Sequence, residues 1–156
     1  MKIKSLLLTW MIGAGLALAC EKTPEPEEIP AQSGYTGTLS VVEIGDALFT
    51  MNDVRADYRL DEDGRLDLYF YDVTFSSQMP VKLSVLMLPD VAYRRDGATL
   101  SLSDSDIVPL MEMRGEMIPY ERYLCTGLSG TLTPAALTLS MRLGGFQTDY
   151  SGRAEP

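Results

Sequence analysis

The feature that most constrains the fold is an alternation of apolar and polar residues with a period of two. Along residues 137–143, leucine or methionine occupies every second position and Thr, Ser or Arg lies between. The same alternation runs along 66–71 and 100–103, and in 81–88 both alternating sets become apolar. Because successive side chains of an extended strand point to opposite sides, this period predicts strands with one buried face.

Turn signals separate these segments. Residues 61–64 and 94–97 each end in Asp-Gly, which indicates tight hairpins, and 45–46 and 133–135 are typical of further turns. A meander of about eight strands tends to close on itself, because closure removes its edges. We therefore expect an all-β, up-and-down antiparallel barrel of about eight strands. The predicted segments, some of which can merge across bulges, are 35–44, 47–60, 65–75, 80–88, 91–94, 98–103, 120–132, 136–143 and 146–153.

Similar tripeptides occur near the two ends of this region. They are Tyr35-Thr36-Gly37 and Tyr150-Ser151-Gly152. We expect the strands that contain them to pair and join the first strand to the last.

One segment, 107–120, departs from the alternation: it is apolar, rich in methionine and interrupted by proline. One interpretation is a plug that packs over the barrel end and fills the core. The other is a lid or rim that contacts an apolar ligand or a partner protein, because methionine side chains adapt to irregular apolar surfaces. The candidate contact residues are Met111, Met113, Met117, Tyr120 and Tyr123.

The order of several short motifs resembles the calycin-like, or lipocalin-like, β-barrel lipoproteins of gut Gram-negative anaerobes. The resemblance implies an eight-stranded barrel over residues 35–153 and no reaction, and a fold analogy alone does not establish a ligand. The matching segments are Tyr35–Leu39, Leu68–Phe75, Met79–Val81, Ile107–Leu110, Gly144–Gly145 and Tyr150–Gly152.

The N-terminus has the layout of a lipoprotein signal peptide. Lys2 and Lys4 precede an apolar stretch too short to span a bilayer, and small residues follow. Leu16-Ala17-Leu18-Ala19-Cys20 resembles a bacterial lipobox, although Ala17 stands where leucine is usual. We expect cleavage after residue 19 and lipid attachment to Cys20. An ordinary signal peptide is the alternative.

Residues 20–34 form an acidic, proline-rich tether between this cysteine and the barrel. Extended, the tether reaches on the order of 40 Å. Acidic residues directly after the cysteine also resemble the surface-export signal of some Gram-negative anaerobes. We therefore expect an outer-membrane lipoprotein exposed at the cell surface, with a merely solubilising tether as the alternative.

The charge balance disfavours nucleic acid as a partner. The chain has 13 basic and 22 acidic residues, and loss of Lys2 and Lys4 with the signal peptide leaves 11 basic residues and a net charge of −11. Nucleic-acid binding depends on neutralised phosphates, and anionic lipid head groups repel such a chain. The expected membrane contact is therefore the lipid anchor.

The residues for common catalytic and metal sites are missing. The sequence has no histidine, and lipid on Cys20 leaves Cys125 without a disulfide partner. We expect Cys125 to be buried within a strand rather than to act as a nucleophile. The acidic clusters 61–64 and 104–106 are interpreted as a hairpin turn and a solvated loop, with a calcium loop and a carboxylate pair as alternatives. We expect no catalytic residues, metal or cofactor.

Two functions remain. The first is non-catalytic binding of a small apolar ligand, because an eight-stranded barrel has room for one. The second is a protein-interaction module with a filled barrel, such as an envelope assembly factor or a surface peptidase inhibitor. A connected apolar cavity of roughly 300 Å³ or more favours the first, and a packed interior favours the second.

Overall fold

The computed structural model describes residues 28–156, so the predicted signal peptide and Cys20 lie outside the described residues. The described part of the chain is almost entirely β, with ten strands and one turn of 3-10 helix, η1 (Glu121–Tyr123). The strands are β1 (Gln32–Val42), β2 (Leu48–Leu60), β3 (Arg65–Val73), β4 (Leu83–Asp96), β5 (Thr99–Asp104), β6 (Leu110–Met113), β7 (Glu116–Pro119), β8 (Cys125–Leu132), β9 (Ala136–Leu143) and β10 (Phe146–Ala154).

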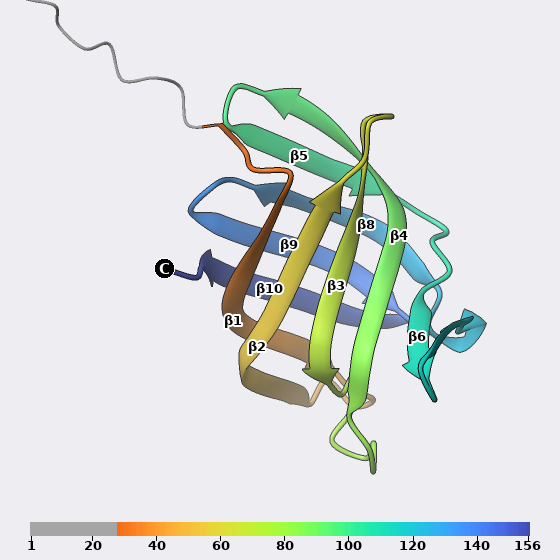
Figure 1. Ribbon diagram of the computed structural model, residues 1–156. Helices are drawn as coiled ribbons and strands as arrows, with labels where there is room; N and C mark the ends of the chain where they lie inside the picture. The colour runs from red at the N-terminus through yellow and green to blue at the C-terminus, as the bar shows by residue number, and fades with distance from the viewer. Residues whose placement is uncertain (1–27) are drawn as a thin grey trace, which may run out of the picture.

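Eight of these strands form a closed antiparallel barrel (Figure 1). Each strand from β1 to β4 pairs with the next one in the chain, β5 pairs with β8, β8 pairs with β9, and β9 pairs with β10. The circle is completed because β10 pairs with β1. This is the connectivity of an up-and-down barrel, and the predicted fold class is confirmed.

The predicted hairpin turns are confirmed. β2 and β3 are joined by residues 61–64, where one carboxylate oxygen of Asp61 accepts the backbone N–H groups of Asp63 and Arg65 at 2.9 and 2.8 Å. Gly64 and Gly97 have positive φ values of 76° and 59°, a conformation that glycine adopts without steric cost. Glycine is therefore the residue that both turns require at these positions.

The segments predicted separately over 80–88 and 91–94 form one strand, β4. Asp90 interrupts it with a φ of 55°, and the pairing with β3 shifts register at this position. The carboxylate of Asp67 on β3 accepts the Asp90 N–H at 3.0 Å, which satisfies a donor that the bulge removes from the ladder. After the bulge β4 pairs with β5, and before it β4 pairs with β6.

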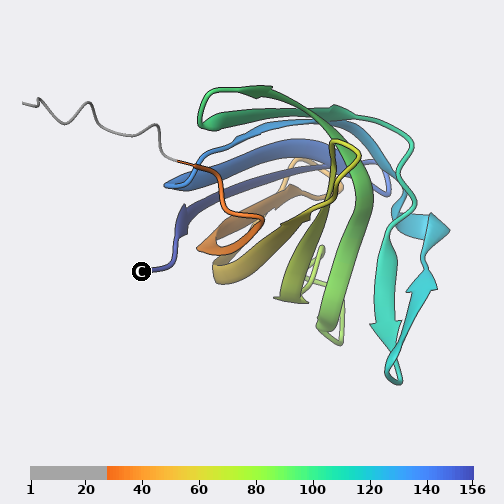
Figure 2. The ribbon, with the colours of Figure 1, turned by 45° about the horizontal axis from the view of Figure 1, so that its top comes forward.

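The interpretation of segment 107–120 as a plug is wrong for residues 110–119, although Ile107 and Pro109 before them are buried. β6 and β7 form a hairpin whose first strand pairs with the edge of β4, outside the barrel (Figure 2). All four residues of β7 are exposed. The two turn residues, Arg114 and Gly115, have φ values of 53° and 82°, as a type I′ turn requires.

Side chains fill the barrel interior. The predicted inward positions of β3, β5 and β9 are buried, and in β4 the inward residues are Leu86 and Leu88. The buried apolar residues form a single cluster, and the largest are almost completely inaccessible to solvent. Among the described residues, every buried side-chain nitrogen or oxygen has a hydrogen-bond partner. The largest fully buried side chains are those of Tyr35, Tyr58, Tyr150, Phe70, Leu39, Leu66, Leu68, Leu86, Leu88, Leu100, Leu128 and Leu132.

One end of the barrel is closed by tyrosines and by the incoming chain. The rings of Tyr35 and Tyr58 pack with centroids 6.0 Å apart. Their hydroxyls donate to the carbonyl oxygens of Thr133 and Pro30, each at 2.7 Å. Ile29 is also buried, so the ordered structure begins before position 35, where the barrel was expected to start.

The predicted pairing of the two strands that contain these tripeptides is confirmed. Gly37 of β1 lies opposite Gly152 of β10. The Tyr150 ring lies over Gly152, where a Cβ atom would come within 2.8 Å of the ring. The Tyr150 hydroxyl donates to the carbonyl oxygens of Tyr35 and Val54 at 3.3 and 3.0 Å. Tyr150 therefore links β10, β1 and β2 from inside the barrel.

The opposite end, here called the mouth, is formed by the β1–β2 turn (43–47), the β3–β4 loop (74–82), η1 and the β9–β10 turn (144–145). The chain enters at the closed end, together with the turns at 61–64, 97–98 and 133–135 (Figure 1). The entry point and the mouth therefore lie at opposite ends of the barrel.

We predict that Tyr150→Phe lowers the free energy of unfolding by about 1–2 kcal/mol, because buried carbonyl acceptors lose their donor while the ring remains. Urea unfolding of the full chain carrying Cys20→Ala measures the change. Tyr93→Phe is the matched control, since the Tyr93 hydroxyl has no hydrogen bond to residues 28–156. Equal stability of Tyr150→Phe and the parent protein would contradict this role.

Candidate functional site

The mouth is held together by backbone hydrogen bonds between its connections. The Tyr120 N–H donates to the Pro109 carbonyl at 2.8 Å, which fixes the start of η1. The Gly144 N–H donates to the Leu124 carbonyl at 3.1 Å, which fixes its end to the β9–β10 turn. The single helical turn is therefore tied on both sides to the barrel wall.

An aromatic cluster lies at the mouth. The ring centroid of Tyr123 is 5.7 Å from that of Phe75 and 4.9 Å from that of Tyr120. Phe75 is buried, and Tyr123 and Tyr120 are half-buried. Burial raises the pKa of the Tyr123 phenol, with a further contribution from neighbouring Tyr120. This cluster covers the filled interior and forms an apolar floor.

Two clefts open beside Tyr123. The first has a volume of about 370 Å³, and its apolar walls are Ile44, Phe75, Tyr123 and Phe146. The second, of about 420 Å³, lies against Met79–Val81, Leu83 and Tyr120. Ser76, Gln78, Arg122 and Tyr123 line both. Each volume is within the range of small-molecule sites, roughly 300–1,000 Å³.

The β3–β4 loop is fastened across the mouth by a carboxylate. Glu43 accepts a hydrogen bond from the Ser77 N–H and another, at 2.9 Å, from the Ser77 hydroxyl. These hydrogen bonds hold the pKa of Glu43 below its ordinary value, and the bond from the Ser77 backbone N–H contributes more than the bond from the Ser77 hydroxyl. The interaction, here called the Glu43–Ser77 latch, joins the β1–β2 turn to the loop that lines both clefts.

The structure brings only part of the predicted contact set together. Tyr120 and Tyr123 line the clefts, whereas the three methionines lie on the β6–β7 hairpin. Met111 is half-buried opposite Leu86, and Met113 and Met117 are exposed. Met113 and Met117 do not line either mouth cleft.

Several cleft residues were not anticipated from the sequence. Phe75 lies in the loop two residues after β3, and Phe146 begins β10; the alternation of these strands gave no sign of an open rim. Glu43 lies in the β1–β2 turn and Arg122 in η1, and neither belongs to a recognisable motif. The sequence could have indicated these residues only through topology. In an up-and-down barrel every second connection lies at the same end, so residues in those connections come together there.

Exposed apolar side chains also gather at the mouth. In the part of the chain that the structure describes, the exposed large hydrophobic residues all lie on the β1–β2 turn, at the start of β2, on the β3–β4 loop or on the β6–β7 hairpin. The pairing register places the hairpin tip beside Ser84, at the mouth end of β4. These residues, here called the apolar tips, are Ile44 (87 % exposed), Leu48 (68 %), Val81 (69 %), Met113 (46 %), Met117 (40 %) and Ile118 (37 %).

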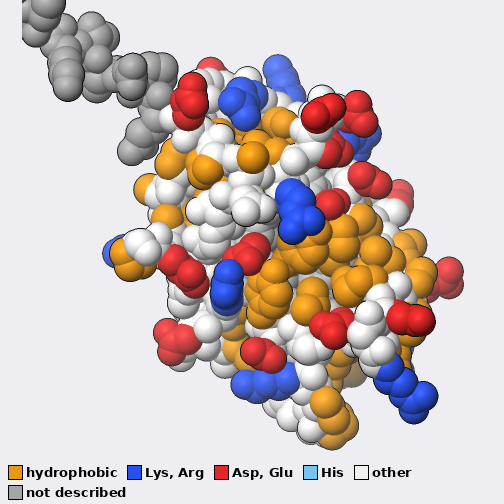
Figure 3. All heavy atoms as spheres, viewed as in Figure 1, with side chains coloured by type: hydrophobic (Ala, Val, Ile, Leu, Met, Phe, Trp, Pro, Cys, Tyr) orange, Lys and Arg blue, Asp and Glu red, His pale blue; other side chains and the backbone are white. Residues whose placement is uncertain are grey.

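An apolar row crosses the outer face of the barrel and meets the hairpin. Tyr69 of β3 lies opposite Met87 of β4, Met87 lies opposite Leu110 of β6, and Leu110 lies opposite Pro119 of β7. Directly opposite residues share a face of the sheet. Figure 3 shows the resulting apolar surface over β3, β4 and β6.

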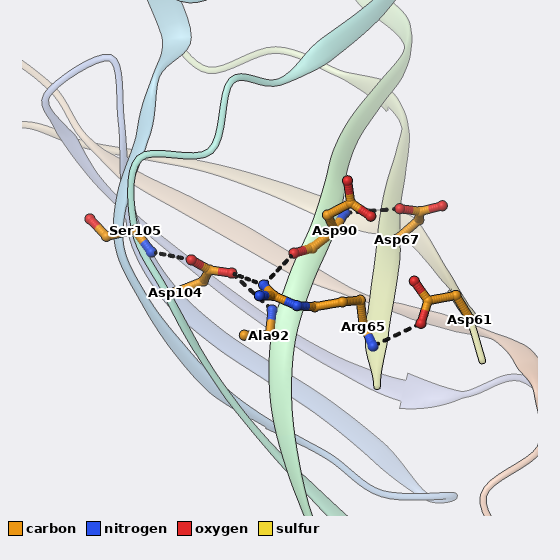
Figure 4. Close-up of polar contacts among 7 residues, drawn as sticks. All are labelled: Asp61, Arg65, Asp67, Asp90, Ala92, Asp104 and Ser105. Atoms are coloured by element: carbon orange, nitrogen blue, oxygen red, sulfur yellow. Dashed lines mark hydrogen bonds and ion pairs between the residues drawn. The ribbon is translucent and has the colours of Figure 1, made fainter. Parts of the chain in front are cut away.

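The acidic clusters have structural roles. Asp104 accepts hydrogen bonds from the N–H groups of Ala92 (2.9 Å) and Ser105 (2.7 Å) and forms an ion pair with Arg65 at 3.3 Å (Figure 4). Asp104, on β5, therefore connects this strand to β4 and β3. Of the two aspartates, only Asp106 is exposed as the solvated-loop interpretation expects. Within residues 28–156 no group of three or more Asp, Glu or Cys side chains is placed to hold a metal ion.

The predicted burial of Cys125 is confirmed. Its side chain is inaccessible to solvent, and its sulfur lies 3.8 Å from the Met141 sulfur. Burial, with a smaller contribution from Asp104, raises the pKa of the thiol to about 12. At neutral pH the reactive thiolate is therefore almost absent.

These features define the class of the protein as a closed, up-and-down antiparallel barrel with a filled interior and an apolar, cleft-bearing mouth. A comparison with protein-family models, with curated proteins and with solved structures finds no significant match to this chain. No helix among residues 28–156 has the length and apolar character needed to cross a bilayer.

We predict that acid releases the Glu43–Ser77 latch. Because the pKa of the folded carboxyl lies below its ordinary value of 4.5, the latch is present above that value and is lost as pH falls through the folded pKa. In amide NMR spectra recorded from pH 6 to pH 3, the Ser77 amide should shift as Glu43 protonates, and Glu43→Gln should abolish that shift. Glu62→Gln, at the closed end, is the control. A Ser77 amide that keeps titrating in Glu43→Gln would exclude the latch as its cause.

Proposed function

We propose that this protein is a non-catalytic envelope lipoprotein that binds a partner protein through its mouth. The observation that carries the proposal is the gathering of the apolar tips at this end. Large apolar side chains that are exposed together at one end of a soluble protein mark a surface that contacts another molecule. Tyrosine and methionine, which supply much of the adjoining surface, are also enriched at protein interfaces.

The filled interior supports a surface function over an internal ligand. Leu39, Phe70 and Tyr150 are essentially inaccessible to solvent and occupy the space in which a lipocalin-type barrel holds its ligand. Any small molecule would therefore have to bind in the clefts at the mouth and not inside the barrel. The protein-interaction hypothesis is therefore favoured over a ligand enclosed by the barrel.

The hairpin suits contacts made through side chains rather than added strands. β7 is the outer strand of the β6–β7 hairpin and ends at Pro119, which has no N–H to donate to a further strand. Met117 and Ile118 are exposed beside it. A partner would bury these side chains without extending the sheet.

The proposed lipid anchor agrees with the position of the mouth. The chain enters the barrel at the closed end, where the Pro30 carbonyl accepts the Tyr58 hydroxyl. A tether from lipidated Cys20 would therefore hold the closed end toward the membrane and direct the mouth away from it. In this orientation the apolar tips meet proteins outside the bilayer, as expected for the proposed outer-membrane lipoprotein.

We predict that radiolabelled palmitate enters the wild-type chain and not Cys20→Ala. Each buried methylene contributes roughly 0.8 kcal/mol to membrane binding, so the variant should also leave the membrane fraction. Cys125→Ala is the matched control and should keep its label, because that thiol is buried. Equal labelling of wild type and Cys20→Ala would exclude the proposed anchor.

Site-specific photocrosslinking in cells tests the partner. A benzophenone amino acid at Ile44 or Met117 should give a discrete protein adduct, whereas the same probe at Glu62 or Arg94, exposed at the closed end, should not. Val81→Ser combined with Ile118→Ser should weaken the adduct, because it removes apolar contact area.

Two results would contradict the proposal. One is the same adduct from closed-end and mouth positions, which indicates crowding at the cell surface. The other is the absence of an adduct from both mouth positions in a protein that is folded and membrane-bound.

A further inference from the structure

The two mouth clefts share a charged residue that the rest of the described chain leaves unpaired. Arg122 lines both clefts beside Tyr123. The ion pairs within residues 28–156 involve Arg55 and Arg65 only, so no carboxylate of that part of the chain lies within 4.0 Å of the Arg122 guanidinium. An arginine fork is suited to bind a carboxylate or sulfonate through two parallel hydrogen bonds.

The other charged residue of the clefts is already engaged. Glu43 accepts the two hydrogen bonds of the latch from Ser77, which stabilise its ionised form. A cationic ligand would have to compete with these donors for the same oxygens. Arg122 is therefore the charged side chain of the clefts that is left without a polar partner among residues 28–156, and in the second cleft it is the one charged residue.

The surfaces beside Arg122 are apolar and partly aromatic. In the first cleft Phe75 and Phe146 face the space together with Tyr123, and in the second Met79 and Leu83 do so. The Tyr123 ring is fixed by its contacts with Phe75 and Tyr120, and its hydroxyl lies 4.0 Å from the Met79 sulfur. The flat apolar part of a ligand can therefore be buried on either side of the Tyr123 ring, while the polar end of the same ligand stays at the rim of the cleft.

We propose that the mouth clefts bind a small amphipathic anion, with an apolar, ring-containing body against Phe75, Phe146 and Tyr123 and a carboxylate or sulfonate on Arg122. The Gln78 side chain lines both clefts and supplies a second polar contact at the rim. This inference goes beyond the protein partner proposed above, because it concerns the clefts beneath the apolar tips and does not require that partner.

The test compares three probes that share one apolar body and differ in charge: 2-naphthoate, neutral 2-naphthamide and cationic 2-naphthylmethylammonium. Each is titrated into the full chain carrying Cys20→Ala, and amide NMR shifts give both affinity and location. We expect 2-naphthoate to bind most tightly and to shift the amides of residues 43–44, 75–79, 120–123 and 146.

Arginine variants separate the ionic contact from the apolar one. Arg122→Gln should weaken 2-naphthoate binding roughly fivefold to tenfold and leave 2-naphthamide unchanged, because it removes the charged fork and keeps most of the side chain. Arg122→Lys should retain more affinity than Arg122→Gln. Arg94→Gln, an exposed arginine at the closed end, is the matched control and should change neither probe. Phe146→Ala should weaken both probes.

Four outcomes would overturn the inference. They are a neutral or cationic probe that binds as tightly as 2-naphthoate, an Arg122→Gln protein with unchanged selectivity, shifts confined to the outer apolar row or the closed end, and no saturable shift with any probe at millimolar concentration. None of these results affects the crosslinking at the apolar tips. The amide spectrum of each variant shows whether it is folded, so a loss of binding is not confused with unfolding.

Discussion

The side chain of Tyr150 is the interaction on which the barrel most depends. Its ring packs edge-on against Phe70 at 5.4 Å and covers Gly152, and its hydroxyl donates to carbonyl oxygens of β1 and β2. Gly152 leaves the space that the ring occupies. One residue thus joins the last strand to the first two, and burial raises the pKa of its phenol, which keeps it neutral and able to donate.

A filled barrel moves function to its surface. When large side chains occupy the interior, a binding site must be built from the connections at one end and from the outer faces of the strands. In this protein the closed end receives the incoming chain, and the tyrosine hydroxyls there are engaged by Thr133 and Pro30. The mouth carries the apolar tips, the two clefts and Arg122. The two ends differ because the incoming chain covers one of them and leaves the other open.

The change of partner along β4 creates the hairpin beside the mouth. The bulge at Asp90 and the contacts of Asp104 with Ala92 and Arg65 lie where pairing with β5 ends. The freed edge of β4 then accepts β6. The sequence did not predict this hairpin because Arg114-Gly115 lacks the asparagine or aspartate that usually marks a type I′ turn, and because an apolar segment interrupted by prolines does not show which edge it will join.

The sequence by itself determined the strand class, the hairpin turn at Asp61–Gly64, a turn beginning at Gly97, the buried face of β9 and the pairing of the first long strand with the last. These features are local, or depend on a period of two that any strand must obey. Only the tertiary structure decided that the interior is filled, that the methionine-rich segment lies outside the barrel, and that Phe75, Arg122 and Phe146 meet at one mouth. Such properties depend on which connections of a closed sheet come together, and an inward leucine has the same sequence pattern whether it lines a cavity or fills one.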